Sequence, residues 1–306
     1  MNFKRILPLF FVLGLLFAPI FSNTAESAGI SVSPLTFEFG ANPGDNVSNL
    51  VKVFNTTDEQ ILVTMDIENF VATGEEGKVA IDSKETNAFS LAQWIVVEPA
   101  TFVVPPHEFV PVEFTINVPL NAEPGGHYAS ILASSGGQPV AGGSAVVQKV
   151  GSLVLLQVAG EVDERMNIES VDAPDFSEYG PVVISSRFRN TGSVHLKPRG
   201  FITITNILGN EVAKLNLEQK NVLPDSIRKI DTEFDGGFLF GKYTATLTAI
   251  YGSKNEPLSY TTSFWVIPWK PTVAVGAGVL VLLFILYIMR KRLALAFKIL
   301  LKGHKV

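Results

Sequence analysis

One uncharged apolar segment constrains this chain more than any other feature of its sequence. It covers Thr272–Met289 and reads TVAVGAGVLVLLFILYIM. As a helix it is long enough to cross about 30 Å of hydrocarbon. Arg290, Lys291 and Arg292 follow directly, and burying one such charge at the bilayer centre costs roughly 2.5–3.5 kcal/mol, so the span is expected to stop before them. A buried core helix is the alternative, but three consecutive basic residues seldom end one.

The basic residues behind this segment predict its orientation. Residues 290–306 contain six Lys and Arg and no acid. Because cytoplasmic flanks carry an excess of basic residues, we expect this tail inside the cell and residues 28–270 outside. Trp265 and Trp269 precede the span and suit the membrane interface. The prediction is a single-pass cell-membrane protein with a transmembrane helix at residues 271–289 and a basic cytoplasmic tail at residues 290–306.

The tail has a second expected role at the membrane surface. On a helical wheel its lysines form one stripe and its apolar residues lie opposite, which is typical of a helix in the membrane interface. Anionic headgroups attract such cations. Two interpretations stay open, lipid binding or enforcement of topology alone. The lysines that would contact membrane lipid are Lys291, Lys298, Lys302 and Lys305.

A second apolar segment at the N-terminus has the features of a secretion signal. Lys4 and Arg5 precede an apolar run at Ile6–Phe21, and small and polar residues follow. This order predicts a Sec signal peptide at residues 1–27, cleaved after Ser27, with an uncleaved N-terminal anchor as the alternative. The chain has no Cys, so no disulfide stabilises its exported part.

Between the two apolar segments the residue pattern is that of β-strands. Short runs rich in β-branched residues or alternating in polarity recur with turn residues between them, whereas long amphipathic helical patterns are missing. Many short strands of this kind predict sandwiches or barrels. The runs are Asn49–Phe54, Ile61–Ile67, Val110–Val118, Val182–Phe188, Gly200–Thr205, Tyr243–Ile250 and Ser259–Val266.

Three pairs of similar segments, in the same order, indicate an internal repeat. We therefore predict an all-β fold of two tandem immunoglobulin-like β-sandwich domains, at residues 28–160 and 161–268, followed by the transmembrane α-helix. The pairs are VKVFNT (51–56) with SRFRNT (186–191), PPHEFVPVEFTINVP (105–119) with LPDSIRKIDTEF (223–234), and GHYASILAS (126–134) with GKYTATLTA (241–249).

Each copy of the repeat contains a Tyr and an Asn with an expected structural role. Tyr128 and Tyr243 fit a tyrosine corner, in which the hydroxyl returns to backbone near the start of a strand. Asn55 and Asn190 each close a strand where a turn starts, and Asn tolerates turn geometry. We expect these four residues to be structural in both domains.

The sequence contains no motif for catalysis or metal binding. His107, His127 and His195 lie at no metal-ligand spacing, and Cys is absent. We interpret His107 and His127 as solvated loop residues, and the acidic pair Glu75-Glu76 likewise. A nucleophile elbow and a P-loop are both missing. An acidic external region argues against nucleic-acid binding, so the expectation is a protein that is not an enzyme and holds no cofactor.

A glycine-rich segment at Ser134–Ser144 is the candidate binding loop. It reads SSGGQPVAGGS and does not lead from a strand into a helix, so it is a flexible loop and not a phosphate cradle. Sandwich modules commonly bind through exposed strand edges or end loops. The candidate binding residues are Gly136, Gly137, Gln138, Pro139, Gly142 and Gly143.

The layout resembles that of the WxL-interacting surface proteins of Gram-positive bacteria. GISVSPLTFEF and NPGDNVSNLVKVFNTTDEQILVTMDI are similar to the start of that family's first domain, and FRNTGSVHLKPRG with GKYTATL to its second. The resemblance implies an adhesion or scaffold protein that binds a cell-wall polymer such as peptidoglycan, or partner surface proteins. It identifies no ligand residues.

The sequence is compatible with one alternative function and argues against another. A structural accessory subunit of a membrane complex, docked through the transmembrane helix, is the alternative. The N-terminal half also resembles pilus-chaperone-type sandwiches, but the membrane anchor and the missing pair of basic carboxylate-binding residues argue against that role.

Overall fold

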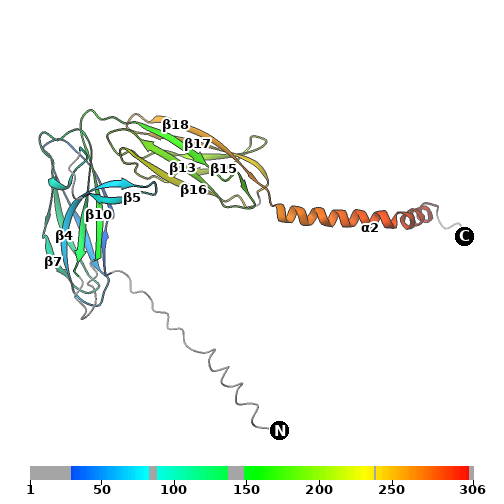
Figure 1. Cartoon of the computed structure of the whole chain (residues 1–306), viewed down its shortest axis with the longest axis horizontal. Helices are drawn as coiled ribbons and strands as arrows, with labels where there is room; N and C mark the ends of the chain where they lie inside the picture. Colours follow the sequence, from blue (N-terminus) through cyan, green and yellow to red (C-terminus); the bar gives the residue numbers. More distant parts are fainter. Residues whose placement is uncertain (1–28, 83–87, 137–147, 238, 303–306) are drawn as a thin grey trace, which may run out of the picture.

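The computed structural model describes residues 29–82, 88–136, 148–237 and 239–302 (Figure 1). The predicted signal peptide at residues 1–27 lies outside these ranges, as do Lys305 and most of the candidate binding loop. The described chain is mostly β-structure with one apolar C-terminal helix, as predicted.

Residues 30–158 form two sheets that share one hydrophobic core, here called the first sandwich. The strands are β1 (Ile30–Ser33), β2 (Thr36–Ala41), β3 (Asn46–Asn55), β4 (Ile61–Thr73), β5 (Lys78–Asp82), β6 (Ile95–Glu98), β7 (Thr101–Val104), β8 (Phe109–Asn117), β9 (Gly125–Ser135) and β10 (Gln148–Val158), with a 3-10 turn, η3 (Ala92–Trp94), before β6. One sheet has the order β1-β3-β8-β6. The other has the order β2-β10-β9-β4-β5, and β7 pairs with β4.

Residues 166–266 form the second sandwich in the same way. Its strands are β11 (Met166–Asp172), β12 (Phe176–Ser177), β13 (Val182–Asn190), β14 (Arg199–Asn206), β15 (Glu211–Asn216), β16 (Ser226–Phe234), β17 (Gly241–Tyr251) and β18 (Glu256–Val266). The sheet orders are β11-β13-β16 and β12-β18-β17-β14-β15. Alternate residues of β17, from Tyr243 to Tyr251, are buried, as the two-residue period of a strand over one core requires.

The two sandwiches repeat one topology. Strand β2 pairs in parallel with β10, and β12 pairs in parallel with β18. The other pairs of described strands are antiparallel. The order β2-β10-β9-β4-β5 thus corresponds to β12-β18-β17-β14-β15, and β1-β3-β8 to β11-β13-β16. The three pairs of similar segments fall on equivalent strands, β3 with β13, β8 with β16 and β9 with β17.

A buried asparagine side chain closes the same turn in both sandwiches. The Nδ2 atoms of Asn55 and Asn190 donate to the carbonyl four residues later, at 2.6 and 2.7 Å. They also donate to the carbonyls of Val104 and Val222, at 3.1 and 2.8 Å. Each Oδ1 accepts from the amide two residues later, at 2.9 Å in both cases. The structural role expected for these residues is confirmed, and it joins two distant segments as well as a turn.

The tyrosine corner is present in only one sandwich. The Tyr243 hydroxyl lies 3.2 Å from the amide nitrogen of Phe240, which is the expected return to backbone. The Tyr128 hydroxyl instead lies 3.3 Å from Nδ1 of His195 in the second sandwich. The prediction for Tyr128 is wrong because the second sandwich packs against this end of β9, and His195 of that sandwich supplies the partner of the hydroxyl.

The histidines of the first sandwich differ in their surroundings. His107 is exposed at the end of a turn, as predicted, and its Nε2 lies 2.8 Å from Asp58. His127 is buried on β9, with its ring 4.4 Å from that of Trp94. The interpretation of His127 as a loop residue is wrong because β9 is a central strand that is covered on both faces.

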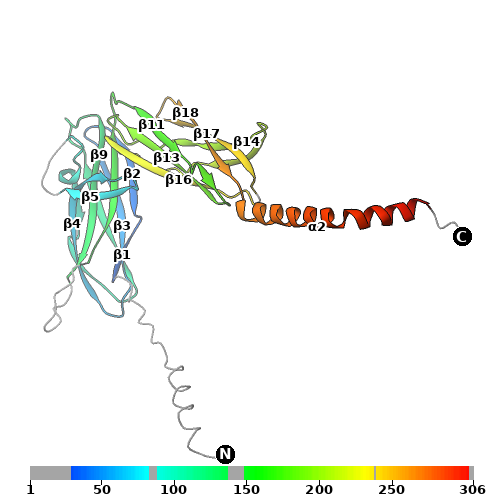
Figure 2. The same ribbon diagram turned by 45° about the vertical axis from the view of Figure 1, so that its right-hand side comes forward.

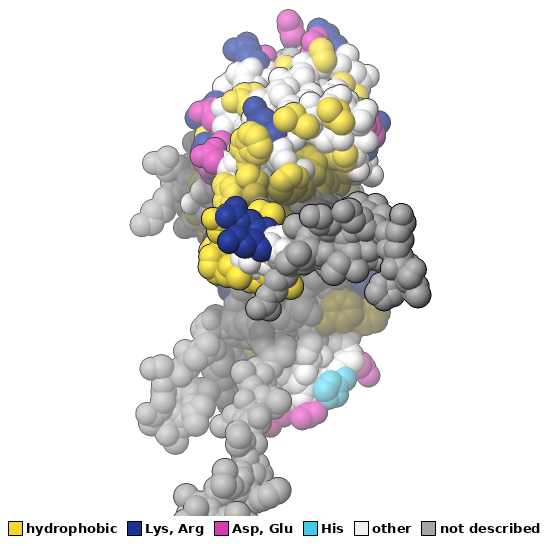
Figure 3. Space-filling view, turned by 90° about the vertical axis from the view of Figure 1, so that its right-hand side faces the viewer, with side chains coloured by type: hydrophobic (Ala, Val, Ile, Leu, Met, Phe, Trp, Pro, Cys, Tyr) yellow, Lys and Arg dark blue, Asp and Glu magenta, His cyan; other side chains and the backbone are white. Residues whose placement is uncertain are grey.

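The C-terminal helix α2 (Trp269–Lys302) projects away from the second sandwich (Figures 1 and 2). Its segment Trp269–Lys291 is long and apolar enough to cross a membrane, and none of its most apolar window is buried. The helix does not end at the basic residues but continues through the predicted tail to Lys302. Figure 3 shows the end of the second sandwich from which the helix departs.

Candidate functional site

The two sandwiches meet at a junction built partly from backbone hydrogen bonds. The amide of Gly126 in β9 donates to the carbonyl of Ser193 at 2.9 Å, and the amide of Lys229 in β16 donates to the carbonyl of Glu75 at 2.7 Å. Such bonds fix chain segments and not only side-chain ends. The junction is therefore a defined feature of the fold, and the β4–β5 hairpin is one of its parts (Figure 1).

The turn of the β4–β5 hairpin carries an ion pair to the second sandwich. The Arg187 guanidinium on β13 donates through both Nε and Nη2 to the carboxylate of Glu75, with Nε 2.7 Å from Oε2. This hydrogen bonding holds the pKa of Glu75 below its ordinary value. The interpretation of Glu75 as a solvated loop residue is wrong because the turn reaches the second sandwich.

A second polar contact joins the two sandwiches through Glu38 on β2. Both of its carboxylate oxygens lie 2.9 Å from Nζ of Lys197, and Nδ2 of Asn221 donates to Oε1 at 2.6 Å. Partial burial favours the neutral acid, but the hydrogen bonds from Lys197 and Asn221 outweigh it. The pKa of Glu38 is therefore lowered, and the carboxylate is ionised at neutral pH.

An apolar cluster fills the junction between these polar contacts. Phe70, Tyr128 and Leu155 of the first sandwich are buried there, and Leu223 of the second packs against them. The cluster is separate from the cores of the sandwiches. His195 lies at its edge, and burial lowers the pKa of its imidazole while the nearby Glu38 carboxylate opposes that shift. His195 is therefore neutral at pH 7 and accepts or donates in the contact with Tyr128.

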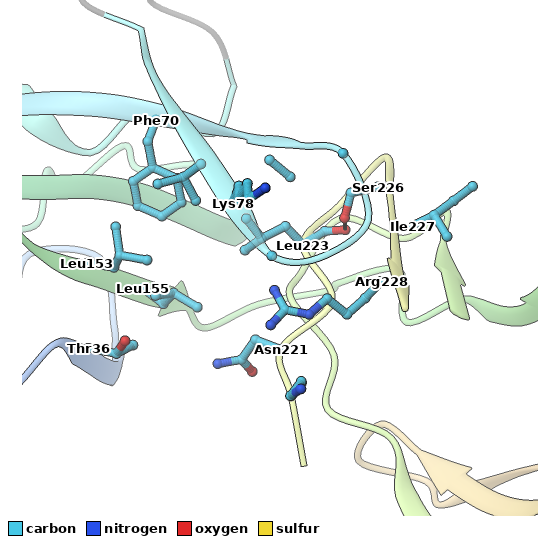
Figure 4. A pocket seen from close by; sticks show the side chains of 15 residues that line it. Thr36, Phe70, Lys78, Leu153, Leu155, Asn221, Leu223, Ser226, Ile227 and Arg228 are labelled. Carbon is cyan, nitrogen blue, oxygen red and sulfur yellow. Dashed lines mark hydrogen bonds between the residues drawn. The ribbon is translucent and has the colours of Figure 1, made fainter. Parts of the chain in front are cut away.

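A cavity of about 220 Å³ opens beside this cluster, with walls from both sandwiches (Figure 4). The first sandwich contributes Leu153 and Leu155, and the second contributes Asn221 and Arg228. Nε of Arg228 and Oδ1 of Asn221 are buried and have no hydrogen-bond partner among the described residues. Burial lowers the pKa of Arg228. The donor Nε of Arg228 and the acceptor Oδ1 of Asn221 thus lack a protein hydrogen-bond partner in residues that line the same cavity as Leu153 and Leu155.

The guanidinium of Arg228 packs against Gly77 in the turn of the β4–β5 hairpin. A Cβ atom on Gly77 would overlap Nη1 of Arg228, and Gly77 has a φ of 79°, which L residues rarely adopt. The close approach of the guanidinium to this backbone therefore needs glycine. Gly77 therefore lines the cavity because a larger residue would displace Arg228, and the residues next to it in sequence do not indicate this.

Gly136, the one described member of the candidate binding residues, lies at the end of the first sandwich away from the junction. Gly136 follows the end of β9 and is exposed, whereas the junction contacts the beginning of β9 at Gly126. Gly137, Gln138, Pro139, Gly142 and Gly143 lie outside the described residues. In the part of the chain that the structure describes, no group of three His, Cys, Asp or Glu side chains is placed to hold a metal ion.

Acidification is expected to loosen the junction. The carboxylates of Glu38 and Glu75 have lowered pKa values, so their contribution is complete above the ordinary value near 4.5 and is lost as pH falls through the folded-state values. The pKa of His195 is also lowered, so opening the junction is favoured as pH falls below the ordinary value near 6.5. The distance between the two sandwiches should therefore increase in two steps as pH falls, one below pH 6.5 and one below pH 4.5.

This pH response is measured as a distance between the sandwiches. The chain has no Cys, so a Leu62→Cys, Thr261→Cys double variant places one spin label on β4 and one on β18, both at exposed positions. His195→Gln should remove the step below pH 6.5 and leave the lower one. A distance distribution that stays unchanged from pH 8 to pH 4 would contradict the expectation.

Comparisons with known proteins find likeness only among solved structures. No protein-family model matches the chain, and no curated protein matches it. The class 5 fimbriae chaperone CfaA is similar at 16% identity and a TM-score of 0.39, over 76% of this chain and 98% of that one. The Pseudomonas aeruginosa CupB2 chaperone is similar at 10% identity and a TM-score of 0.35, over 77% of this chain and 100% of that one. The E. coli chaperone DraB is similar at 12% identity and a TM-score of 0.34, over 78% of this chain and 95% of that one. At these TM-scores the likeness carries no functional assignment.

Proposed function

We propose that this chain is a non-enzymatic, single-pass membrane protein that displays two immunoglobulin-like sandwich domains outside the cell, where they bind a cell-envelope component or a partner surface protein. The observation that carries the proposal is that no residue of the apolar window in α2 is buried. A core helix would be covered by the sandwiches. Apolar surface is driven out of water at about 25 cal/mol per Å², so this helix needs another apolar environment, and a bilayer supplies it.

The orientation and the ligand class belong to the same proposal. The basic residues behind the span favour a cytoplasmic C-terminus. The resemblance in layout to WxL-interacting surface proteins favours peptidoglycan or a surface protein as the ligand. Peptidoglycan and surface proteins both contain peptide bonds, so a site that recognises a peptide amide could bind either ligand.

The proposed recognition site is the junction cavity. A peptide amide carries one donor and one acceptor, which complement Oδ1 of Asn221 and Nε of Arg228. Nδ2 of Asn221 is held by Glu38, so the amide oxygen is the group left to a ligand. The wall of Leu153 and Leu155 suits an apolar side chain beside that amide. Because an unmade buried hydrogen bond costs about 1–3 kcal/mol, a small movement of these side chains onto a bound peptide is favourable.

The topology is tested by protease digestion of intact cells. Digestion should remove the region before Trp269 and spare a tag placed after Val306. Cleavage of the C-terminal tag in intact cells would contradict the orientation. Full-length chain that is extracted from membranes by alkaline carbonate alone would contradict the anchor.

Binding is tested with full-length chain in liposomes, offered either purified peptidoglycan or a library of envelope-protein peptides. Arg228→Met keeps the length of the side chain and removes its donors, so affinity should fall roughly tenfold to a hundredfold. Arg199→Met, at an exposed position of β14, is the matched control and should bind like the parent chain. Equal binding by both variants would place recognition outside the cavity. Binding to peptidoglycan alone or to protein peptides alone identifies the source of the ligand.

A further inference from the structure

Large apolar side chains are exposed at the end of the second sandwich from which α2 departs. Leu208 is 80% exposed and Ile207 71% exposed, in the turn between β14 and β15. Phe240 precedes β17 and is 60% exposed. Soluble surfaces seldom gather such residues without a partner. We call the whole set the apolar rim, and its members are Phe176, Tyr179, Ile207, Leu208, Phe240 and Trp265.

Strand register brings the members of the rim to one end of the sandwich. Asn206, at the end of β14, is opposite Tyr243, so the turn that follows lies near the start of β17. Gly241, at the start of β17, is opposite Val266, the last residue of β18. Phe176 is beside Trp265 in the parallel pair of β12 and β18. Hydrophobic side chains are visible on this face in Figure 3.

The helix leaves this end without a flexible linker. Two residues, Ile267 and Pro268, separate β18 from α2. The amide of Ile267 donates to the carbonyl of Ser177 at 3.0 Å, and Lys270 forms an ion pair of 2.9 Å with Glu178. Both partners lie in or next to β12. The direction of the helix relative to the rim is therefore held by contacts on the sandwich.

We propose that the apolar rim is embedded in the outer interface of the same bilayer that α2 crosses. This inference rests on the proposed membrane anchorage. A span that starts at Trp269 brings the rim to the headgroup level, where Trp and Tyr side chains are favoured and apolar side chains leave water. The second sandwich then stands on the membrane, and the junction is held one strand length away, about 35 Å for the 11 residues of β17.

The bilayer fits the rim better than a protein partner does. The members of the rim belong to separate turns and strand ends at the end of the sandwich where α2 begins. The rim adjoins the apolar surface of α2, because its member Trp265 is four residues before the half-exposed Trp269, the first residue of the helix. A lipid surface can adapt to side chains from separate segments beside the start of a membrane span, where apolar side chains leave water.

The test uses single cysteines in the full-length chain, which has no native Cys. Leu208→Cys carries an environment-sensitive fluorophore in liposomes that contain either a nitroxide-labelled lipid or external iodide. Leu120→Cys is the matched control, because Leu120 is also a turn leucine, 87% exposed, on the first sandwich. Ile285→Cys reports on the span itself.

The expected result is that the Leu208 probe shifts to the blue, is quenched by the labelled lipid and loses most of its quenching by iodide, while the Leu120 probe responds to iodide alone. If the Leu208 probe behaves like the Leu120 probe while the Ile285 probe lies in lipid, the rim is not embedded in the bilayer. That result would overturn this inference and leave the proposed membrane anchor intact. An Ile285 probe in water would overturn the anchor as well. A Leu208 probe shielded from iodide but not quenched by lipid would show burial against protein and would also overturn the inference.

Discussion

Replacing Asn190 with alanine is expected to destabilise the second sandwich by about 3–5 kcal/mol. The amide side chain is fully buried and bonds two carbonyls and one backbone amide. Alanine would remove the side-chain partner of the Val194 carbonyl and the Gly192 amide, whereas the Val222 carbonyl would keep its bond from the amide of Leu196. Each unsatisfied buried group costs about 1–3 kcal/mol. Water cannot easily replace the side chain because the site is closed by Val194 and Val222, both buried.

Urea unfolding of the full-length chain in detergent micelles measures this loss. Asn167→Ala is the control, because Asn167 is an exposed residue of β11, and it should change the free energy of unfolding by no more than about 0.5 kcal/mol. Asn55→Ala should have the same effect in the first sandwich as Asn190→Ala has in the second. A loss below about 1 kcal/mol in both variants would mean that the freed groups find other partners.

Replacing Gly200 with alanine is expected to cost about 3 kcal/mol. A Cβ atom on this residue of β14 would lie 2.1 Å from the carbonyl oxygen of Thr248 and 2.6 Å from Cα of Ala249. Both atoms belong to the backbone of β17, which pairs with β14 in the centre of the sheet. The overlap can be relieved only by separating two paired strands, so the ladder and the core beneath it are both disturbed.

Gly40→Ala provides a matched control for this substitution. Gly40 also lies within a strand, β2, but a Cβ atom there would meet nothing within 4 Å. Its replacement should be neutral or stabilise the chain by up to about 1 kcal/mol, since alanine reduces the freedom of the unfolded state. Equal unfolding free energies for Gly200→Ala and Gly40→Ala would show that β14 and β17 are less closely paired than the structure has them.

Local patterns in the sequence predicted the strands and the helix. All seven predicted runs overlap strands, because alternation over one core is a property of consecutive residues. The repeated segments fell on equivalent strands for the same reason. Asn55 and Asn190 were recognised as turn residues, but their bonds to Val104 and Val222 were not, since the partners lie 49 and 32 residues away.

The errors have one physical cause in common. His127, Tyr128 and Glu75 were interpreted from their neighbours in sequence, and each is instead defined by a contact with a distant segment. Trp94 covers His127, His195 meets the Tyr128 hydroxyl, and Arg187 binds Glu75. A turn-like sequence cannot indicate that another part of the chain will pack onto it.

Composition and residue period were enough to predict an all-β region with an internal repeat, and an apolar helix at Thr272–Met289 ahead of basic residues. The junction cavity and the apolar rim, in contrast, depend on how the strands pack and pair. Alternation shows which face of a strand is buried but not what covers it. The cavity joins residues as distant as Leu155 and Arg228, and the rim joins Phe176 to Leu208. Such sites arise when register and packing bring remote segments together, and no local pattern records that.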